Sequence, residues 1–358
     1  MQKDGQGTPG LRPDPLFAPP TGPPFHSVRP GGYMRILSIL PALIVVCCSI
    51  SYATAGSVIE RVRAHGVVRC GSVARPGLAC AAGQNHWTGL NVDICRAVAA
   101  AVLGSSERIE YHAYATPKDF DAVRNHQDDI YFLTGTEIHE QKLAGKVLPG
   151  PAVFVESHVV MTPANSSVHH IGDLAGDSIC FMIGSPVERS IEAYFDTLQK
   201  DWFRRAFSEY GEMNDAYNAQ SCHAIAGEIT TLASVRLDPG VNRLSSRILP
   251  ETLADFPVMA ATGTQDAQWS SIVAWTVHTL VSAERPETRW YAGGPGAMPI
   301  SAQEIGLDKD WQRRVLAAVG NYGEIFDRNL GNGSALKIDR GLNANHIRGG
   351  LLLSPFLE

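Results

Sequence analysis

The sequence predicts an α/β protein with two lobes, and three observations lead to that fold class. Short apolar strands alternate with helices along most of the chain, which is typical of mostly parallel sheets covered by helices. The 303 residues that follow residue 55 are enough for two ordinary lobes. The chain is also expected to pass between the lobes twice, near Met161 and near 256–262. Two such crossings imply a hinge with a cleft between the lobes.

The first 55 residues are expected to lie outside the folded protein. Residues 1–33 hold eight Pro and six Gly without hydrophobic periodicity, which predicts a disordered, mis-called N-terminal extension. Residues 34–55 have the pattern of a cleaved signal peptide: Met34 and Arg35, an apolar run, and small residues at 53–55. The apolar run has 15 residues, fewer than the roughly 20 that span a bilayer. The protein is therefore expected to be exported.

The composition and the motifs exclude several classes of function. The formal net charge is −6 and no basic stripe is present, so nucleic acid is not an expected partner. The sequence has no dinucleotide-binding, phosphate-binding, zinc-protease or serine-hydrolase motif. The adjacent histidines His169 and His170 are interpreted as an exposed pair. We therefore expect neither a cofactor nor a metal.

Five cysteines follow the signal segment: Cys70, Cys80, Cys95, Cys180 and Cys222. Exported proteins meet an oxidising compartment, where disulfide bonds form. The odd number leaves at least one thiol free. The spacings lack the close cysteine pairs that a zinc site needs.

The first lobe begins with alternating helices and strands. The expected order is a helix at 57–66, a strand at 67–73, a Pro/Gly loop at 74–86, a helix within 87–104, a strand at 108–115, a helix at 117–125 and a strand at 128–133. Apolar residues at helical spacing and a glycine that suits the C-cap support the helix within 87–104. These residues are Val92, Cys95, Val98, Ala99, Val102 and Gly104.

The rest of the chain is expected to form the second lobe and then return to the first. A strand at 156–165 leads into the second lobe, whose elements lie in 177–195, 221–235 and 246–251. After a return strand at 256–262, two helical stretches follow, at 270–284 and 308–330. An apolar stripe at the first of these stretches is expected to be core: Trp269, Ile272, Val273, Thr276 and Leu280.

Candidate ligand residues lie where strands end. Ligands of α/β sheets bind beyond the carboxyl ends of the strands, where the loops at 72–86 and 133–142 are expected. Ser185 is expected to cap a helix, with Glu188 completing a capping box, and that helix N-terminus could also attract an anionic group. Glu228 follows a short apolar strand, where it is either a helix cap or a partner for an ammonium group.

Five segments of the chain carry a resemblance to a known family. They are RCG at 69–71, WTGLNVDICRAVAAAVLG at 87–104, SIEAYF at 190–195, VGNYGEIFDRNLG at 319–331 and RGLNANHIRGGLLLSPF at 340–356. Together they resemble the periplasmic amino-acid-binding proteins of ABC importers, solute-binding protein family 3, especially its general L-amino-acid-binding branch. The likeness covers nearly all of the chain after residue 55.

The resemblance implies a type II periplasmic-binding-protein fold, a hinged clamp that closes on one small molecule. Lobe 1 would comprise 56–161 and 258–358, and lobe 2 would comprise 162–257. The implied function is the periplasmic solute-binding component of an ABC-type import system for amino acids or related small polar compounds, without enzymatic activity. The implied partners are a small polar ligand and an inner-membrane ABC permease, and the protein is expected to be a monomer.

The resemblance also implies roles for individual residues. Cys180 is implied to pair with Cys222, and Cys70 with Cys95, which leaves Cys80 unpaired. Four further positions match ligand-binding positions of the family. Thr134 and Thr136 fall on its polar turn, and Ser185 falls on the start of the helix whose amides hold the ligand's carboxylate. Glu228 falls on the aspartate that binds the ligand's α-ammonium group.

The arginine that grips the ligand's α-carboxylate in the family is missing from its expected place. It lies twelve residues after the position of Asp129, where this chain has Gln141. Losing one partner of a buried ion pair costs on the order of 2–5 kcal/mol, so ordinary amino acids are expected to bind weakly. Arg75 from the first loop, or Lys142, could supply the missing charge. The expected ligand is then a neutral or cationic polar compound such as an amide or an amine.

Two alternative functions stay open at this point. The chain could be a divergent member without a transport role, either the partner of a sensor or a pair of lobes that binds no small molecule. It could also be a lyase similar to cyclohexadienyl dehydratase, with Glu137, Glu140 and Glu228 as its candidate acids. That chemistry needs a carboxylate clamp, so the missing arginine argues against it.

Overall fold

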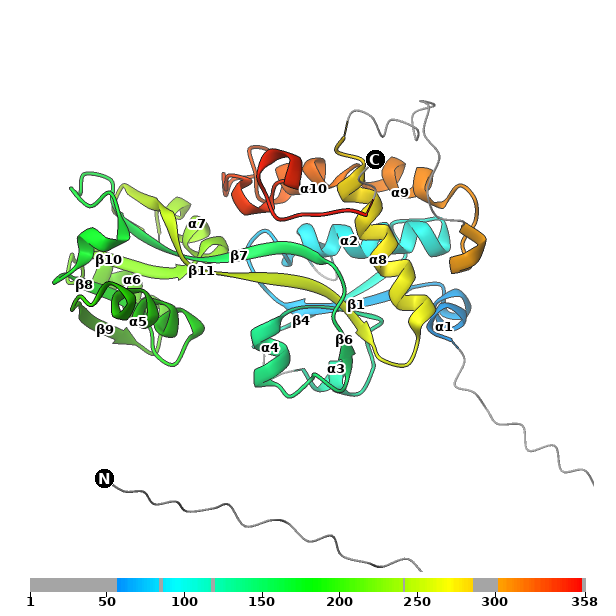
Figure 1. Ribbon diagram of the computed structural model, residues 1–358, viewed down its shortest axis with the longest axis horizontal. Helices are drawn as coiled ribbons and strands as arrows, with labels where there is room; N and C mark the ends of the chain where they lie inside the picture. Colours follow the sequence, from blue (N-terminus) through cyan, green and yellow to red (C-terminus); the bar gives the residue numbers. More distant parts are fainter. Residues whose placement is uncertain (1–56, 84–85, 117–119, 241, 286–301, 356–358) are drawn as a thin grey trace, which may run out of the picture. The chain divides into compact units, whose positions relative to one another are not determined.

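The structure is a computed structural model that describes residues 57–83, 86–116, 120–240, 242–285 and 302–355. The expected N-terminal extension and signal segment lie outside these residues. Within the described part, no helix is both long enough and apolar enough to cross a membrane. The protein has the α/β fold class that the sequence predicts (Figure 1).

Helices and strands alternate through most of the chain. The helices are α1 Val58–His65, α2 Leu90–Leu103, α3 Asp121–Arg124, α4 Gly135–Glu140, α5 Pro186–Leu198, α6 Tyr210–Asn218, α7 Ile229–Leu237, α8 Ala267–Ser282, α9 Trp311–Val319 and α10 Tyr322–Asn329. The strands are β1 Val68–Val73, β2 Cys80–Gly83, β3 His86–Thr88, β4 Ile109–Tyr114, β5 Ile130–Thr134, β6 Val147–Leu148, β7 Ala152–Pro163, β8 Ser178–Met182, β9 Phe203–Phe207, β10 Ala224–Glu228 and β11 Ser246–Gly263. The sequence pattern did not predict β2, β3, β6, β9, α4 or α6, and α4 lies within the predicted loop at 133–142.

Two groups of parallel strands are joined by two long antiparallel strands. The sheet runs in the order β4-β1-β5-β11-β7-β10-β8-β9, with β6 paired to β11. Strands β4, β1 and β5 are parallel to one another, and so are β10, β8 and β9. Strands β7 and β11 lie side by side and connect the two groups (Figure 1). Each lobe therefore has its own parallel group, and β7 and β11 form the hinge.

Strand β11 is longer than the sequence pattern predicts. The apolar segments at 246–251 and 256–262 belong to one strand, which shifts register against β7 between Ile248 and Thr252 and again before Ala254. Register shifts of this kind bend a strand without ending it. They also interrupt the alternation of apolar and polar residues, which is why the pattern indicates two strands.

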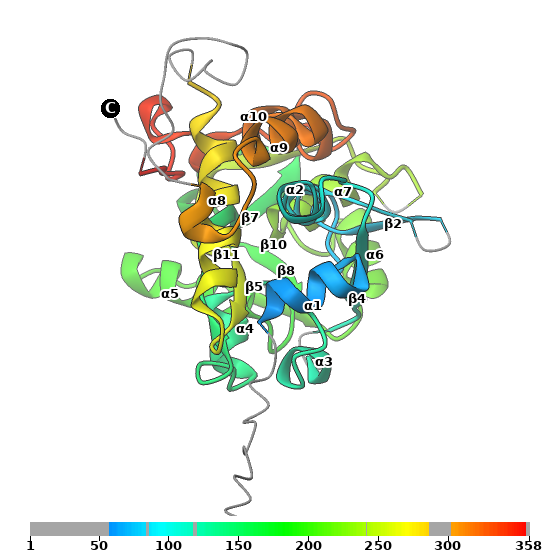
Figure 2. The same ribbon diagram turned by 90° about the vertical axis from the view of Figure 1, so that its right-hand side faces the viewer.

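The core of lobe 1 lies under four helices. Figure 2 shows α2 end on, and α2 contacts α8, α9 and α10. The predicted apolar stripe at α8 is buried, because each of its five members is at most 1% exposed. Its largest member, Trp269, also donates its indole N–H to the backbone oxygen of Asp129 at 2.8 Å. The prediction that this stripe is core is confirmed.

The helical stretch predicted at 308–330 is two helices. Helix α9 ends at Gly320, whose φ of 78° lies in a region that favours glycine. The next residue, Asn321, begins α10 as its N-cap and exchanges hydrogen bonds with Glu324 in a capping box. A glycine followed by a capping residue is a local stop and start signal inside an otherwise helical pattern.

The predicted loop at 74–86 contains a hairpin, in which β2 and β3 pair antiparallel. Ahead of the hairpin, the backbone oxygen of Arg75 accepts from the N–H groups of Leu78 at 3.1 Å and Ala79 at 2.9 Å. After it, Gly89 has a φ of 134°, and a Cβ there would lie 2.2 Å from the backbone oxygen of Leu78. These close backbone contacts fix the loop, so Arg75 projects from a defined position.

Two disulfide bonds tie helices and loops to strands. Cys70 of β1 is bonded to Cys95 of α2, with 6.3 Å between their Cα atoms. Cys180 of β8 is bonded to Cys222, with 5.8 Å between the Cα atoms. Cys80 is free. This is the pairing that the family resemblance implied.

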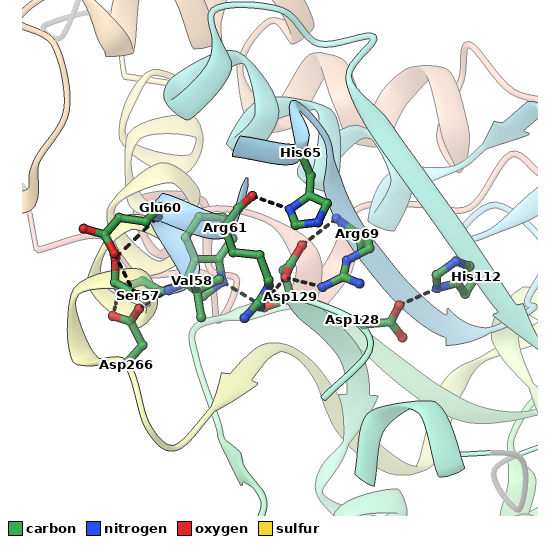
Figure 3. Close-up of polar contacts among 11 residues, drawn as sticks. Ser57, Val58, Glu60, Arg61, His65, Arg69, His112, Asp128, Asp129 and Asp266 are labelled. Atoms are coloured by element: carbon green, nitrogen blue, oxygen red, sulfur yellow. Dashed lines mark hydrogen bonds and ion pairs between the residues drawn. The ribbon is translucent and has the colours of Figure 1, made fainter. Parts of the chain in front are cut away.

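A polar cluster fixes α1 and β1 against the start of β5 (Figure 3); we call Arg61, Arg69 and Asp129 the Asp129 cluster. The carboxylate of Asp129 accepts from Arg61 Nη2 at 2.6 Å, from Arg69 Nη2 at 3.3 Å and from the backbone N–H of Arg69 at 2.9 Å. Asp129 is only 3% exposed. Two guanidinium groups and a backbone donor thus balance one buried carboxylate, which holds in register two strands that lead to the candidate site.

Candidate ligand-binding site

A cavity of about 550 Å³ lies where the two lobes face each other, and we call it the interlobe cavity. Its lobe 1 wall is formed by the ends of β1 and β5, the loop after β1, and α4. Its lobe 2 wall is formed by α5, α6 and the turn from β10 to α7. Residues of β7 and β11 lie at its base. The carboxyl ends of parallel strands thus meet the cavity from both sides, as expected for this class of sheet.

Five of the six predicted ligand residues line the interlobe cavity. They are Arg75, Thr134, Thr136, Ser185 and Glu228. The acids Glu137 and Glu140, which sequence analysis considered only for a lyase, line it as well. The structure therefore brings together residues that lie up to about 150 positions apart in the sequence.

Arg75 occupies the centre of the charged part of the cavity. Its Nη2 donates to Glu137 Oε1 at 2.8 Å, and its Nε lies 3.6 Å from Glu228 Oε2. Its side chain is 12% exposed, so both interactions are poorly screened by water. Burial disfavours its charge, but the carboxylates of Glu137, Glu228 and Glu156 outweigh that effect and hold the pKa of Arg75 above its ordinary value. Arg75 remains a cation at any accessible pH.

Helix α4 begins directly at the end of β5. Thr134 is its N-cap: the Thr134 hydroxyl accepts from the backbone N–H of Glu137 at 3.1 Å, and Glu137 Oε2 accepts from that of Thr134 at 2.7 Å. Residues three and four apart share one face of a helix, so Glu137 and Glu140 both reach the cavity from α4. The Glu137 carboxylate binds Arg75 with one oxygen and the helix N-terminus with the other.

Gln141 and Lys142 do not line the interlobe cavity. Gln141 is the C-cap of α4, one residue beyond Glu140, so it lies about 100° further round the helix. Lys142 is exposed and has a positive φ of 53°. Of the two cations proposed to replace the family arginine, the structure brings only Arg75 to the cavity. Its partner in α4 is Glu137. The sequence count had instead placed the ligand-binding position of this segment at Gln141.

Ser185 caps α5, as the sequence predicts. Its hydroxyl accepts from the backbone N–H of Glu188 at 3.3 Å and donates to the backbone oxygen of Met182 at 2.6 Å. The predicted capping box is wrong by one residue, because Glu188 Oε2 accepts from the backbone N–H of Gly184 at 2.6 Å. The glycine, with a φ of 70°, turns its N–H toward that carboxylate. The Ser185 hydroxyl is thus held between the end of β8 and the start of α5.

Two glutamates converge at the N-terminus of α7. Glu228 ends β10 and is the N-cap of α7, but its side chain makes no capping hydrogen bond. Instead, Glu156 of β7 accepts from the backbone N–H of Thr230 at 3.2 Å and from its hydroxyl at 2.9 Å. Burial, and then the nearby Glu228 carboxylate, raise the pKa of Glu156 to about 8. Glu156 is therefore largely protonated at neutral pH, which leaves Glu228 as the acid presented to the cavity.

Four further cavity residues were not singled out from the sequence: His158 and Phe256 on the hinge strands, and Tyr210 and Asn214 on α6. The rings of His158 and Phe256 lie 4.6 Å apart. Burial lowers the pKa of His158 to about 4, so this ring is neutral at pH 7. Glu156 and His158 lie two residues apart and therefore share one face of β7, which was a usable sequence signal for the hinge residues.

Two ion pairs cross the cavity from one lobe to the other. Arg75 of lobe 1 approaches Glu228 of lobe 2, and Arg189 Nη2 of α5 lies 2.9 Å from Glu140 Oε1 of α4. The second pair is largely exposed, with 57% of the Arg189 side chain accessible. Exposed pairs of this kind contribute about 0–1 kcal/mol each. At the cavity, the two lobes therefore approach each other through charged groups.

A second hollow, of about 960 Å³, lies behind the hinge. It is bordered by Leu249–Thr252 of β11 and by the C-terminal segment 337–343. It is larger than the interlobe cavity but contains none of the predicted ligand residues. The ends of the parallel strands do not open into it. We therefore assign ligand binding to the interlobe cavity.

Comparisons with known proteins agree with this architecture. No family model matches the chain. The general L-amino acid-binding periplasmic protein AapJ of Rhizobium johnstonii is 30% identical over 338 residues, which cover 90% of this chain and 98% of AapJ. The glutamate/glutamine/aspartate/asparagine-binding protein BztA of Rhodobacter capsulatus is 27% identical over 339 residues, 87% of this chain and 96% of BztA.

A solved structure shares the fold. It is an ABC transporter periplasmic binding protein from Brucella ovis with glutathione bound. Its TM-score is 0.68 at 29% sequence identity, and the match covers 83% of this chain and 98% of the Brucella chain. The two-lobed arrangement described above is thus that of an experimentally observed binding protein.

Proposed function

Because the chain belongs to the amino-acid-binding periplasmic proteins of ABC transporters, we propose that it captures a small polar compound carrying a protonated nitrogen in the interlobe cavity. The chain is the periplasmic solute-binding component of an import system. The finer part of the proposal concerns the ligand and the residues that hold it. Glu228 and Asn214 would bind the protonated nitrogen from lobe 2. Thr134 and Thr136 would offer hydroxyl groups from lobe 1.

The observation that carries the proposal is the position of Glu228. Its side chain is 25% exposed, it caps no backbone N–H of α7, and it lines the cavity opposite the lobe 1 wall. The only hydrogen bond that it accepts from α7 among the described residues is a long one, 3.5 Å from the Thr231 hydroxyl. A carboxylate that caps no backbone N–H and faces a cavity is suited to bind a cationic group of a ligand. The nearby Arg75 lies at 3.6 Å, beyond ordinary hydrogen-bond distance.

Binding would bring the lobes together in the following way. A ligand that touches both walls interacts better with the closed arrangement than with an open one, so it shifts the equilibrium toward closure. The hinge strands β7 and β11 contribute Glu156, His158 and Phe256 to the cavity lining, so a bound ligand would lie against the hinge. The closed protein would then deliver the ligand to an inner-membrane permease.

Further parts of the proposal concern export and activity. We propose that residues 34–55 direct export and are removed, with residues 56–161 and 258–358 forming lobe 1 and residues 162–257 forming lobe 2. We also propose that the protein acts as a monomer and catalyses no reaction. The support for a binding role is that AapJ, BztA and the Brucella protein are binding proteins by name.

The proposal can be tested by thermal shift and calorimetry on protein purified from the periplasm. The ligand panel contains amino acids, amides, amines and glutathione. We expect at least one nitrogen cation to bind, and Glu228→Gln to weaken its affinity roughly thirtyfold or more, since breaking a buried charge pair costs on the order of 2–5 kcal/mol. Glu212→Gln is the matched control, because Glu212 is an exposed acid of α6.

Two results would overturn the proposal. One is the absence of binding by every nitrogen cation in the panel, although the protein melts cooperatively. The other is equal binding by the wild type and the Glu228→Gln variant.

A further inference from the structure

The interlobe cavity carries an excess of acid. Among the described residues that line it, Arg75 is the one guanidinium or ammonium group, whereas four side chains are glutamates: Glu137, Glu140, Glu156 and Glu228. Glu156 is largely protonated, His158 is neutral, and Glu140 is paired with Arg189. At neutral pH, Glu137 and Glu228 therefore share the single positive charge of Arg75. A ligand that adds a carboxylate worsens this balance, and a ligand that adds only positive charge improves it.

The positive charge of Arg75 is already shared with two acids of the protein, Glu137 and Glu228. Arg75 binds Glu137 at 2.8 Å, and the Glu137 side chain is 5% exposed. Glu137 cannot turn away to water, because its other oxygen holds the backbone N–H of Thr134 at 2.7 Å. A ligand carboxylate would either displace Glu137, leaving a buried charge unpaired, or enter as a further acid beside it. Both outcomes oppose an α-amino acid.

A second and independent observation concerns Asn214 of α6. Asn214 is 7% exposed and lines the cavity, and its side-chain oxygen has no hydrogen-bond partner among the described residues. A buried acceptor without a partner costs about 1–3 kcal/mol. Only a donor can satisfy it, and an ammonium or guanidinium group offers several N–H donors. A carboxylate has none.

Aromatic side chains complete the cavity. Phe256 of β11 and Tyr210 of α6 both line it. Cations are attracted to aromatic faces by about 0.5–2 kcal/mol, whereas carboxylates gain nothing there. The acids, the unpartnered oxygen of Asn214 and these rings therefore favour the same ligand charge.

We infer that the cavity selects an organic cation without a carboxylate, an amine or guanidine compound, over the α-amino acid that has the same side chain. This inference rests on the proposed function and narrows its ligand class. Glu228 and Asn214 bind the protonated nitrogen. The ion pair between Arg75 and Glu137 opposes binding of a carboxylate. Arg75 is the only cation among the described residues of the cavity lining, and Glu137 already shares its charge.

Pairs of compounds that differ only in one carboxylate test this inference directly. Agmatine is compared with arginine, putrescine with ornithine, and cadaverine with lysine, by calorimetry on the purified protein. We expect the decarboxylated member of at least one pair to bind ten times more tightly or better. Glutathione, which carries two carboxylates, is expected not to compete.

A single variant tests the cause. Glu137→Gln keeps the capping box of α4, since glutamine serves at that position, but it removes the charge that occupies Arg75. We expect the preference for the decarboxylated member to shrink at least fivefold, mainly through tighter binding of the amino acid. Glu212→Gln, on an exposed site, is expected to leave the ratio unchanged. Melting temperatures of all variants establish that they are folded.

The outcomes separate this inference from the proposed function. Tighter binding by the amines, with a ratio that falls in Glu137→Gln, supports both. Equal or tighter binding by the amino acids, or an unchanged ratio in Glu137→Gln, overturns the inference and leaves the proposed function standing. Binding by none of the six compounds to folded protein, while another nitrogen-containing compound with a carboxylate binds, overturns the inference as well.

Discussion

Two carboxylate sites of the molecule handle charge in opposite ways. In the Asp129 cluster, two guanidinium groups and a backbone N–H surround one buried carboxylate. In the interlobe cavity, one guanidinium group serves Glu137 and Glu228, with Glu156 and Glu140 nearby. The first arrangement is complete and holds strands in place. The second has less positive than negative charge, and a cationic ligand can supply the missing positive charge.

The comparison predicts its largest effect on stability at Asp129. Asp129→Ala leaves the guanidinium groups of Arg61 and Arg69 without their shared carboxylate. It also leaves the backbone N–H of Arg69 in β1 without the carboxylate oxygen that accepts from it. Breaking a buried ion pair costs about 3–5 kcal/mol, so the free energy of unfolding is expected to fall by that amount in urea denaturation. The relative affinities for amines and amino acids should not change. Asp121→Ala is the control, since its side chain is 77% exposed and pairs with Arg124 on the surface, which makes a change below about 1 kcal/mol the expected result.

The next prediction concerns the pH dependence that Glu156 causes. Its pKa is raised to about 8 by burial and then by Glu228, against a pull in the other direction from Arg75. Between its ordinary value and about 8, the native state binds a proton that the unfolded chain has lost. Its contribution to stability is therefore complete at low pH and is lost as the pH rises toward 8.

This contribution is on the order of a few kcal/mol and is measured as a difference. The free energies of unfolding of the wild type and of Glu156→Gln are determined from acidic to alkaline pH. We expect the wild type to lose stability relative to the variant as the pH rises, because glutamine cannot ionise. A constant difference across this range would show that Glu156 titrates near its ordinary value.

Asn214 separates binding from stability. Asn214→Leu removes the unpartnered oxygen, so the protein without ligand should be at least as stable as the wild type. Amine affinity should fall about tenfold or more, since a buried hydrogen bond to a charged group is worth about 1.5–3 kcal/mol. Asn214→Asp should have the opposite effect on amine affinity, because it adds a carboxylate that attracts the protonated amine. If both variants bind amines like the wild type, Asn214 does not contact the ligand.

The sequence predicted more of the fold than of the site, and particular residues show why. Ser185 as a helix cap, Gly104 as a C-cap and the core stripe from Trp269 to Leu280 depend on neighbours along the chain, and all three are confirmed. Which residue of α4 faces the cavity depends on where that helix begins, and one residue rotates the choice by about 100°. Counting along the chain therefore pointed to Gln141, whereas the side chains at the cavity are Glu137 and Glu140.

The approach of Arg75 to Glu137 and Glu228 depends on chain segments far apart in sequence. Glu137 lies 62 residues from Arg75, and Glu228 belongs to the other lobe. No local pattern specifies such a contact. The sequence could indicate that Arg75 borders the cleft, but its two acidic partners follow only from the packing of the hinge strands and the loop that Gly89 holds in place.

The smallest expected effect tests whether amine affinity depends on the number of acids at the cavity or on how deeply each acid is buried. Glu140 lines the cavity, but its side chain is 39% exposed and pairs with Arg189. Glu140→Gln removes as much formal charge as Glu228→Gln, yet exposed pairs contribute about 0.2–1 kcal/mol, so amine affinity should fall less than fivefold. High salt should abolish this small loss of affinity, because added ions screen the interaction between the ligand and an exposed carboxylate. A loss as large as that of Glu228→Gln would mean that the ligand lies against α4 rather than against the N-terminus of α7.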